Sequence, residues 1–343
     1  MFKSITLAAV WLAASQVSAA PLRTRQANAT DSFDYIIVGS GAAGIPLAAK
    51  LSKSGLRTLL IERGPPSSGR WGGTQKPSWL DGTNLTFYDV PALDNEIYAG
   101  DFSKNIYCDD VEGAIAGCVL GGGTAINAGL WWRPATIDWD WTFPDGWHSS
   151  DMTGATERVF QKIPGTPIPS QDGHLYTQQG AGLLEWSFEQ AGWTRETSND
   201  TPEQKTQKRV FTNTTFMYEN GERGGPMATY LVEADARSNF ELWTNTMVER
   251  VVRDGSKITG VELKSAGSGG HNGTVTVSAK GAVVLSAGAF GSPKILFRSG
   301  IGPRDQLEVV KAAESDKMIA EAQWIDLPVG YNLLDNINVS IIL

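Results

Sequence analysis

The chain has 343 residues, which is enough for about two domains, and its 41% hydrophobic and 19% charged residues are ordinary for a globular protein. The formal net charge is −8. An acidic chain without basic runs is a poor candidate for nucleic-acid binding, because phosphate contacts need clustered Lys and Arg. Beyond the N-terminus no segment approaches the length of a membrane span.

The first residues have the pattern of a secretory signal peptide, predicted over residues 1–19. Lys3 gives a positive start, residues 5–14 are apolar but too short to span a bilayer, and small residues at 17–19 suit cleavage. The alternative is an ordinary N-terminal helix. We therefore expect a secreted, extracellular protein with a flexible leader over residues 20–32. Six N-x-S/T sequons then predict a glycosylated surface: Asn28, Asn84, Asn199, Asn213, Asn272 and Asn338.

Cysteine usage fits the same compartment. The sequence has two cysteines, Cys108 and Cys118. In an oxidising environment they can form one disulfide that closes a short loop, and the alternative is two buried thiols. We favour the disulfide.

The predicted elements begin with a β-α-β unit. Residues 34–38 are predicted as a strand, 42–54 as a helix and 58–62 as a second strand. Residues 65–110 are rich in Gly, Pro, Ser and Asn, which favours loops. A helix is predicted around residues 178–191.

From residue 240 the pattern changes to alternating strands. "FELWTNTMVERVVRD", "KITGVELKSA" and "TVTVSA" alternate as strands do, and the glycine-rich residues 267–273 suit a hairpin tip. Residues 282–288, "AVVLSAG", are continuously apolar, which predicts a separate, buried parallel strand.

The turn of the β-α-β unit carries the motif G-x-G-x-x-G at Gly39, Gly41 and Gly44. The first glycine permits a tight turn, the second lets the backbone approach a pyrophosphate, and the third lets the helix pack closely on the strand. The helix N-terminus favours the phosphates. Glu62 suits hydrogen bonds from ribose hydroxyls and would repel a 2′-phosphate, and its neighbour Arg63 joins the predicted cofactor site. The alternative is a glycine-rich turn in an unrelated α/β domain, and the motif does not separate NAD from FAD.

Two further segments decide between these cofactors. They are "GCVLGGGTAINAGLWWRPATIDWD", residues 117–140, and "GAFGSPKILFRSGIG", residues 288–302. With the first motif they resemble the glucose–methanol–choline (GMC) oxidoreductases, which use FAD. The matching positions are Gly121, Gly122, Gly123, Thr124, Asn127, Pro134 and Asp140, then Gly288, Ser292, Pro293, Ser299, Gly300 and Gly302.

This resemblance implies an α/β fold, with a Rossmann-like FAD-binding domain of GMC type and an incomplete α+β substrate domain. The FAD domain is expected to comprise residues 33–145 and 225–303, and the partial substrate domain residues 146–224 and 304–343. The residues implied to contact FAD are Val119, Gly122, Thr124, Asn127, Ala128, Gly129, Leu130, Val248, Ala287 and Gly288. Val248 could equally be ordinary core. No histidine lies between residues 113 and 147, so we expect non-covalent FAD.

A narrower resemblance is to the flavin domain of fungal cellobiose dehydrogenases. It is carried by "GERGGPMATYL", residues 221–231, and by residues 238–261. Those enzymes usually carry a haem domain ahead of the flavin domain, and here we expect none in the chain. A sugar substrate also suggests stacking on tryptophans, although packing in the core is the alternative. The candidates are Trp131, Trp132, Trp139, Trp141 and Trp147.

The implied reaction is oxidation of the CH–OH group of a sugar or alcohol, with hydride passing to flavin N5 and electrons leaving to an external acceptor. Such chemistry normally uses a histidine base. His148, His174 and His271 are all expected in surface or structural roles, so no catalytic residue and no metal ligand is predicted. The family's catalytic histidine lies further towards its C-terminus. Residues 338–343 are predicted as a strand cut short, and we therefore expect a truncated form.

Three different functions stay open beside this one. The chain could be a relative of aryl-alcohol or glucose oxidases, a hydroxynitrile lyase that uses the flavin fold without net redox, or an inactive remnant that binds FAD.

Overall fold

The computed structural model describes residues 32–99, 106, 108–111, 115–197, 199–200, 202–203, 209–315 and 317–335. The predicted signal peptide, almost all of the leader, the sequons at Asn28 and Asn338, and the predicted terminal strand lie outside the described residues. Within the described part, no helix is long and apolar enough to cross a membrane.

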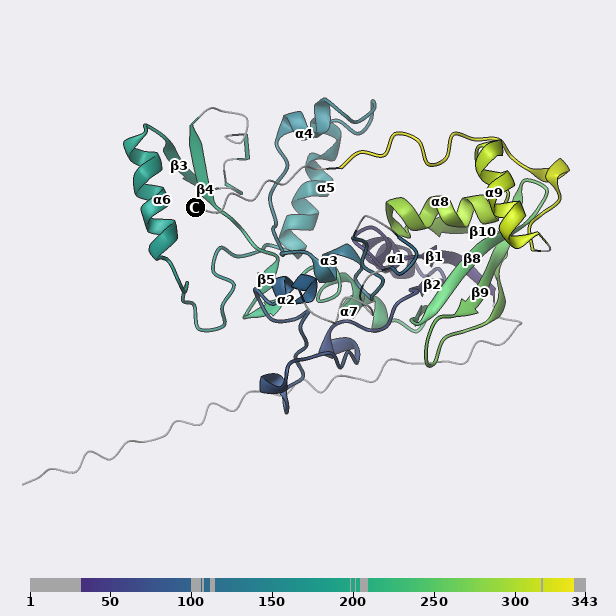
Figure 1. Ribbon diagram of the computed structural model, residues 1–343, viewed down its shortest axis with the longest axis horizontal. Coiled ribbons are helices and arrows are strands. Elements are labelled where there is room, and N and C mark those ends of the chain that lie inside the picture. The colour runs from purple at the N-terminus through teal and green to yellow at the C-terminus, as the bar shows by residue number, and fades with distance from the viewer. Residues whose placement is uncertain are drawn as a thin grey trace, which may run out of the picture.

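The central feature is a six-stranded mixed sheet, seen on the right of Figure 1. In spatial order its strands are β7 (Phe240–Trp243), β2 (Thr58–Ile61), β1 (Ser32–Val38), β10 (Gly273–Leu285), β9 (Lys257–Ser265) and β8 (Thr246–Asp254). The first four run parallel, and β10, β9 and β8 pair antiparallel. The sheet joins elements from both segments of the predicted FAD domain.

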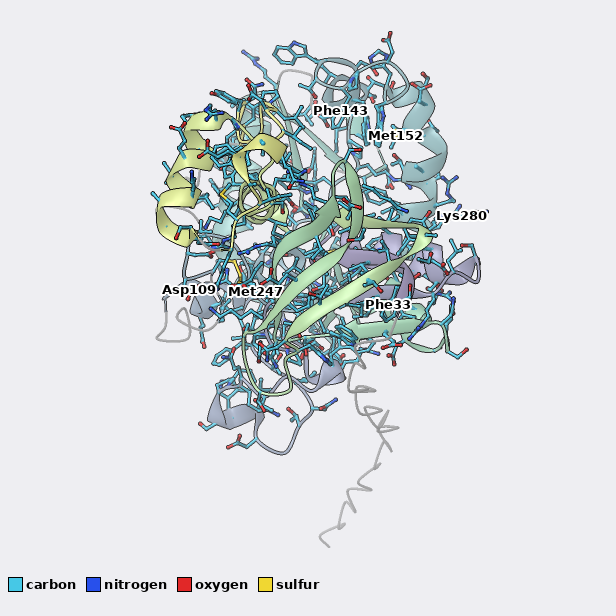
Figure 2. The ribbon with its side chains drawn as sticks, turned by 90° about the vertical axis from the view of Figure 1, so that its right-hand side faces the viewer. Phe33, Asp109, Phe143, Met152, Met247 and Lys280 are labelled. Atoms are coloured by element: carbon cyan, nitrogen blue, oxygen red, sulfur yellow. A yellow bond between two sulfur atoms is a disulfide. The ribbon has the colours of Figure 1, made fainter. Side chains whose placement is uncertain are left out.

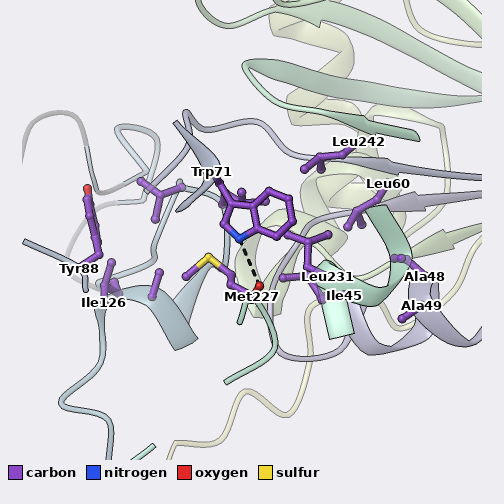
Figure 3. Close-up of a cluster of buried hydrophobic side chains, with 14 of the residues drawn as sticks. Ile45, Ala48, Ala49, Leu60, Trp71, Tyr88, Ile126, Met227, Leu231 and Leu242 are labelled. Atoms are coloured by element: carbon purple, nitrogen blue, oxygen red, sulfur yellow. Dashed lines mark hydrogen bonds between the residues drawn. The ribbon is translucent and has the colours of Figure 1, made fainter. Parts of the chain in front are cut away.

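Helices cover both faces of this sheet because its strands are apolar on both sides. On one face Ile37 packs with α1 (Gly44–Lys53) and α7 (Tyr230–Asp235). On the other, Ile36 and Val38 share a core with Ile295 of α8 (Gly288–Arg298). Figure 3 shows the first core extending beyond the sheet, where Nε1 of Trp71 donates to the Met227 carbonyl at 3.2 Å.

The remaining elements lie mostly to the left of the sheet in Figure 1. The helices and 3₁₀ turns are η1 (Gly69–Trp71), η2 (Ser78–Leu80), α2 (Asp94–Ala99), α3 (Gly123–Ile126), α4 (Thr136–Asp140), α5 (Ser149–Lys162), α6 (Gln179–Gln190), α9 (Arg304–Glu314) and η5 (Glu321–Gln323). The short strands are β3 (Thr194–Thr197), β4 (Val210–Asn213), β5 (Tyr218–Glu219) and β6 (Glu222–Arg223). The division into two domains stays a prediction.

Most predicted elements are confirmed. The first β-α-β unit, the helix near residues 178–191 and the hairpin tip occur. The meander occurs as the antiparallel strands β8, β9 and β10, but "FELW" is not part of it: it forms β7, which pairs with β2 at the opposite edge of the sheet. A further prediction is only partly confirmed: "TVTVSA" and "AVVLSAG" are not two strands but the single strand β10, although "AVVL" pairs parallel with β1 as predicted. Between these two segments the register with β1 shifts, because residues 278–281 of β10 lie opposite the single residue Asp34, and the strand continues through this irregularity. Residues 282–285 are only partly buried, whereas the sequence pattern predicted full burial.

Candidate functional site

A cavity of about 620 Å³ lies at the carboxyl ends of the parallel strands. Its walls are the turn between β1 and α1, the end of β2, the loop before α3, the start of β8 and the turn between β10 and α8. Figure 2, turned by 90° from Figure 1, labels Met247, which lines the cavity near the start of β8. Ligands of open α/β sheets bind outside the carboxyl ends of the strands, so this cavity is the candidate cofactor site.

The structure places two of the three motif glycines in the roles that the sequence predicts. Gly39 has a φ of +100°, a left-handed conformation that favours glycine, and a Cβ there would lie 2.4 Å from the Ser286 carbonyl oxygen. A Cβ on Gly44 would lie 1.9 Å from the Gly39 carbonyl oxygen. Gly39 therefore permits the turn, and Gly44 lets α1 pack against the end of β1.

Gly41 differs, because the protein itself leaves space beside it. A Cβ built at Gly41 meets no atom within 4 Å, and the same holds for Gly123 at the start of α3. Both residues line the cavity. Packing therefore does not demand glycine at either position, and the bare backbone opens onto space that a ligand can fill. This cradle fits the pyrophosphate of a dinucleotide beside the N-terminus of α1.

Glu62 lies at the end of β2, lines the cavity and is 6% exposed. One carboxylate oxygen, Oε2, accepts hydrogen bonds from the Ser40 amide at 3.0 Å and the Ser40 hydroxyl at 2.5 Å. The other, Oε1, accepts from the Gly64 amide at 2.8 Å. Burial raises the pKa of Glu62, and these hydrogen bonds oppose the rise. A carboxylate has about four acceptor positions, so one is left for a ribose hydroxyl.

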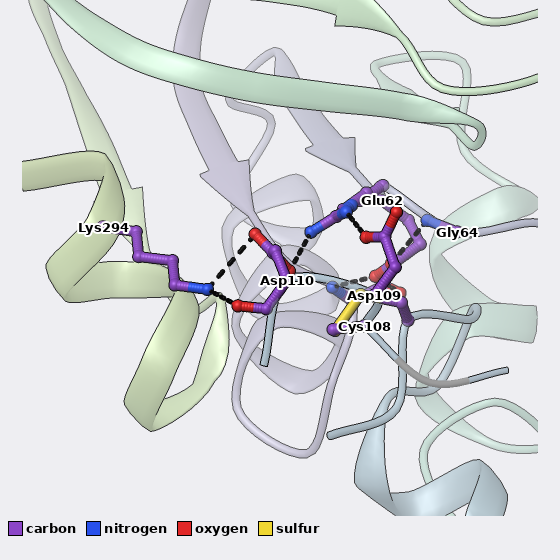
Figure 4. Close-up of a disulfide and its surroundings, with 9 residues drawn as sticks. Glu62, Gly64, Cys108, Asp109, Asp110 and Lys294 are labelled. Atoms are coloured by element: carbon purple, nitrogen blue, oxygen red, sulfur yellow. Dashed lines mark hydrogen bonds and ion pairs between the residues drawn. A yellow bond between two sulfur atoms is a disulfide. The ribbon is translucent and has the colours of Figure 1, made fainter. Parts of the chain in front are cut away.

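A disulfide closes the rim of the cavity. Cys108 and Cys118 are bonded, as the sequence favoured, and both line the cavity. Figure 4 shows Lys294 pointing at Asp110, next to the disulfide. Arg63 contacts Asp110 as well, and also Asp109. Burial works against ionisation of Asp110, but Arg63 and Lys294 outweigh it and lower the Asp110 pKa. Arg63 therefore ties the disulfide loop to the end of β2.

The structure divides the predicted cofactor residues into two groups. Those that line the cavity are Gly39, Gly41, Glu62, Arg63, Gly122, Val248, Ala287 and Gly288. Those that lie outside its lining are Gly44, Val119, Thr124, Asn127, Ala128, Gly129 and Leu130. Val119 is fully buried, and Thr124 lies in the four-residue helix α3. Their contacts with FAD stay predictions.

Sequence reasoning missed several residues of the site. Ser40 occupies a variable position of the glycine motif, yet its amide and hydroxyl hold Glu62. Asp110 and Lys294 come together across 184 residues of sequence. Arg223 is 5% exposed and donates to Asn127. Its only sequence signal is its place in "GERGGPMATYL", which indicates a resemblance but no role for the arginine.

All three histidines lie in the described residues, and none lines the cavity. A ring nitrogen of His148 contacts the Phe143 carbonyl, and one of His174 contacts the Asp172 carbonyl. His271 stacks on Trp243, and burial lowers its pKa. The described residues also contain no cluster of His, Cys, Asp and Glu suited to a metal ion.

The five candidate tryptophans divide by exposure. Trp131 stacks on Phe160 and donates to the Ile163 carbonyl, so it packs within the protein. Trp139 packs against Phe143. Trp132, Trp141 and Trp147 are 48%, 83% and 54% exposed, which leaves their rings accessible to a ligand.

The fold and this cavity define a dinucleotide-binding α/β protein of the Rossmann type. Residues 33–338 match the sequence profile of the GMC oxidoreductase family. The chain therefore belongs to the GMC oxidoreductases, and membership of this family implies FAD as the cofactor.

Comparisons with individual proteins agree with this family assignment. The chain is 30% identical over 320 residues to an oxygen-dependent choline dehydrogenase of Vibrio vulnificus (strain YJ016), and the match covers 90% of this chain and 53% of that protein. It is 32% identical over 291 residues to an (R)-mandelonitrile lyase-like protein of Arabidopsis thaliana, covering 81% and 47%. A solved structure of an FAD-dependent oxidoreductase from Chaetomium thermophilum superposes with a TM-score of 0.60 at 20% identity, covering 81% and 49%. The chain thus spans about half the length of the relatives it matches.

Proposed function

We propose that this chain provides the FAD-binding part of an oxidoreductase that acts on the CH–OH group of a sugar or alcohol. The observation that carries the proposal is the open backbone of Gly41 and Gly123 beside the buried carboxylate of Glu62. That combination suits a pyrophosphate followed by an adenosine ribose. Bound FAD would accept hydride from the substrate carbon, and an external acceptor would then take the electrons.

The chain's own residues would bind and orient the cofactor. The turn at Gly41 and the N-terminus of α1 would hold the pyrophosphate, and Glu62 would accept a hydrogen bond from the ribose. Val248 and Ala287 line the cavity where the adenine would lie. We infer that none of the three histidines is the base, because all three make other contacts away from the cavity.

The narrower form of the proposal is a secreted, glycosylated sugar oxidoreductase similar to cellobiose dehydrogenases. Trp141 and Trp147 support it as exposed rings for an apolar sugar face. Asn84 and Asn272 are exposed and suit glycans, whereas Asn199 does not. Its Nδ2 donates to the Trp131 carbonyl and its Oδ1 accepts from the Arg133 amide, so both ends of its amide are held against the protein and a glycan on Nδ2 would crowd this contact.

A lyase is the second candidate, and one observation favours keeping it. The mandelonitrile lyase-like relative is 32% identical to this chain, so the same fold accompanies a protein named for a reaction without net redox. An oxidase of aryl alcohols or glucose and an inactive FAD-binding remnant also stay open as functions.

Anaerobic mixing of substrate with an FAD-loaded form that spans the full length of the relatives separates these functions. Bleaching of the flavin by cellobiose or another alcohol supports the oxidoreductase, and release of cyanide from mandelonitrile without bleaching supports the lyase. Reoxidation by O₂ or by a quinone then distinguishes an oxidase from a dehydrogenase. Binding of FAD with neither reaction leaves the remnant.

Tryptophan variants test the sugar proposal. In a form that spans the full length of the relatives, we expect Trp141→Ala and Trp147→Ala to weaken saccharide affinity, while Trp139→Ala, whose ring packs against Phe143, serves as the matched control. Unchanged saccharide affinity in both exposed-ring variants would contradict stacking.

A further inference from the structure

Ser40 is a buried serine at the point where three segments of the cavity wall meet. It stands between Gly39 and Gly41 in the first glycine motif and is 0% exposed. Its hydroxyl donates to Oε2 of Glu62 at 2.5 Å and accepts from the Gly121 amide at 3.3 Å. The turn after β1, the end of β2 and the loop before α3 therefore share one hydroxyl group.

The direction of these bonds follows from the groups around the hydroxyl. A backbone amide can only donate, so the hydroxyl oxygen accepts from Gly121 and its single proton is left for Glu62. The carboxylate oxygens of Glu62 also face two amides, that of Ser40 at 3.0 Å and that of Gly64 at 2.8 Å. All three of these partners are donors, which suits an ionised carboxylate and not a carboxylic acid.

The backbone does not need this hydroxyl. In Ser40→Ala the Ser40 amide would still donate to Oε2 of Glu62, and the Gly121 amide would still donate to the carbonyl of residue 40 at 3.1 Å. Both amides would therefore keep a partner. The substitution removes one hydrogen bond to a buried charge, and such bonds are roughly twice as strong as those between neutral groups.

Two opposing effects act on the charge of Glu62. Burial disfavours the ionised form and raises the pKa, whereas the Ser40 hydroxyl, the two amides and the positive charge of Arg63 lower it. Of the effects that oppose burial, the Ser40 hydroxyl is the largest. Arg63 is itself paired with Asp109 and Asp110, so its charge is shared with the disulfide loop.

We propose that Ser40 is a positioning residue for Glu62: its hydroxyl holds the carboxylate ionised and oriented, so that the remaining acceptor position serves a ribose hydroxyl of the cofactor. This inference rests on the proposed function, because Glu62 has to stay an acceptor only where a nucleotide ribose binds. It gives a role to the residue after the first motif glycine, a position that the motif itself leaves variable.

Isothermal titration of the full chain with FAD over a range of pH tests the proposal. Affinity should rise with pH as Glu62 ionises, and in Ser40→Ala this rise should come at higher pH because the bond that favours the charge is gone. The affinities of the two proteins should be close at high pH and differ by about tenfold at the acidic end, which is the loss that one bond to a charged group represents. Melting curves confine the comparison to pH values at which both unliganded proteins are folded.

A ligand without ribose hydroxyls isolates the contact. ADP should show the same pH-dependent loss in Ser40→Ala as FAD does. In contrast, 2′,3′-dideoxy-ADP, which has no ribose hydroxyl to donate, should bind wild type and variant equally at every pH. A loss of 2′,3′-dideoxy-ADP affinity that matched the loss for ADP would contradict the proposal.

Ser67→Ala is the matched control. Ser67 is also 0% exposed, and its hydroxyl donates to the Leu120 carbonyl at 2.6 Å, just before the same glycine loop. It does not line the cavity. We expect Ser67→Ala to melt at a lower temperature and to keep the wild-type pH dependence of FAD binding.

The Glu62→Gln background keeps the test decisive if Ser40→Ala fails to fold. That background has no carboxylate for Ser40 to hold, so Ser40→Ala should add no pH-dependent loss there, and the double variant should fold. A double variant that stayed unfolded would overturn the proposal.

Two results with the single variant would overturn this proposal alone. One is equal FAD affinity of wild type and Ser40→Ala at every pH, and the other is a loss by the same factor at every pH, which a merely structural role of Ser40 predicts. A wild-type chain that bound no FAD at any pH would overturn the proposed function as well.

Discussion

Replacing Glu62 by glutamine is the sharpest test of the ribose contact. Three of about four acceptor positions on the Glu62 carboxylate are used by Ser40 and Gly64, which leaves one for the cofactor. A hydrogen bond to a charged group contributes about 1.5–3 kcal/mol. Its loss corresponds to roughly 10- to 150-fold weaker FAD binding.

The substitution also disturbs the protein itself. The amide of a glutamine has one oxygen, so either the Ser40 amide or the Gly64 amide loses its acceptor. A buried donor without a partner costs about 1–3 kcal/mol of unfolding free energy. Urea denaturation measures that loss, and isothermal titration with FAD measures the affinity.

The control and the contradicting result are simple. Glu189→Gln changes an exposed glutamate on α6 and should alter neither quantity. FAD affinity within about twofold of wild type in Glu62→Gln would refute the ribose contact, since one lost bond to a charged group should cost more. A competition binding experiment provides a second test of the ribose contact. ADP should displace FAD, whereas an ADP analogue carrying a 2′-phosphate should not.

Three further predictions follow from the same cavity. Gly41→Val should abolish FAD binding with little change in melting temperature, because its side chain enters space that holds no protein atom. Gly44→Val should instead unfold the domain, because its side chain collides with the Gly39 carbonyl. Equal stability losses in the two variants would contradict this interpretation. Joint replacement of Cys108 and Cys118 by serine should lower the unfolding free energy by about 2–3 kcal/mol, measured in urea, because a short closed loop is released. The pKa of Asp110 is lowered from 3.8 in the folded chain, so its stabilising contribution is present above pH 3.8 and is lost as pH falls through the folded-state pKa. Asp110→Asn should therefore make the unfolding free energy fall less steeply as the pH is lowered through this range. An unchanged pH dependence would refute the Asp110 contacts.

Glu62 has the opposite pH dependence, which separates it from Asp110. Burial raises its pKa above the ordinary 4.5, so its contribution to stability is present below pH 4.5 and is lost as pH rises through the folded-state pKa. A glutamine at this position should remove that decline.

Local sequence patterns predicted the part of the site that the first β-α-β unit forms. The glycine spacing, an apolar strand before it and an acid at the end of the next strand specify one β-α-β unit, and Gly39, Gly44 and Glu62 lie as that unit requires. The alternation after residue 240 likewise predicted the meander. These features depend on neighbours in sequence, which is why the sequence alone revealed them.

Long-range contacts were not predictable in the same way. Arg63 and Lys294 both contact Asp110, although they are far from it in the sequence. Arg223 reaches Asn127 from a two-residue strand that has no periodic pattern. The merging of two predicted strands into β10 has the same cause, because residues 278–281 are accommodated as a bulge where β10 pairs with β1.

One measurement tests the central claim most directly: isothermal titration of the wild-type chain and Gly41→Val with FAD. We predict saturable binding of one FAD per chain to the wild type and none to Gly41→Val, with similar melting temperatures for the two unliganded proteins. Equal FAD binding by both proteins, or no binding by the wild type, would contradict the claim.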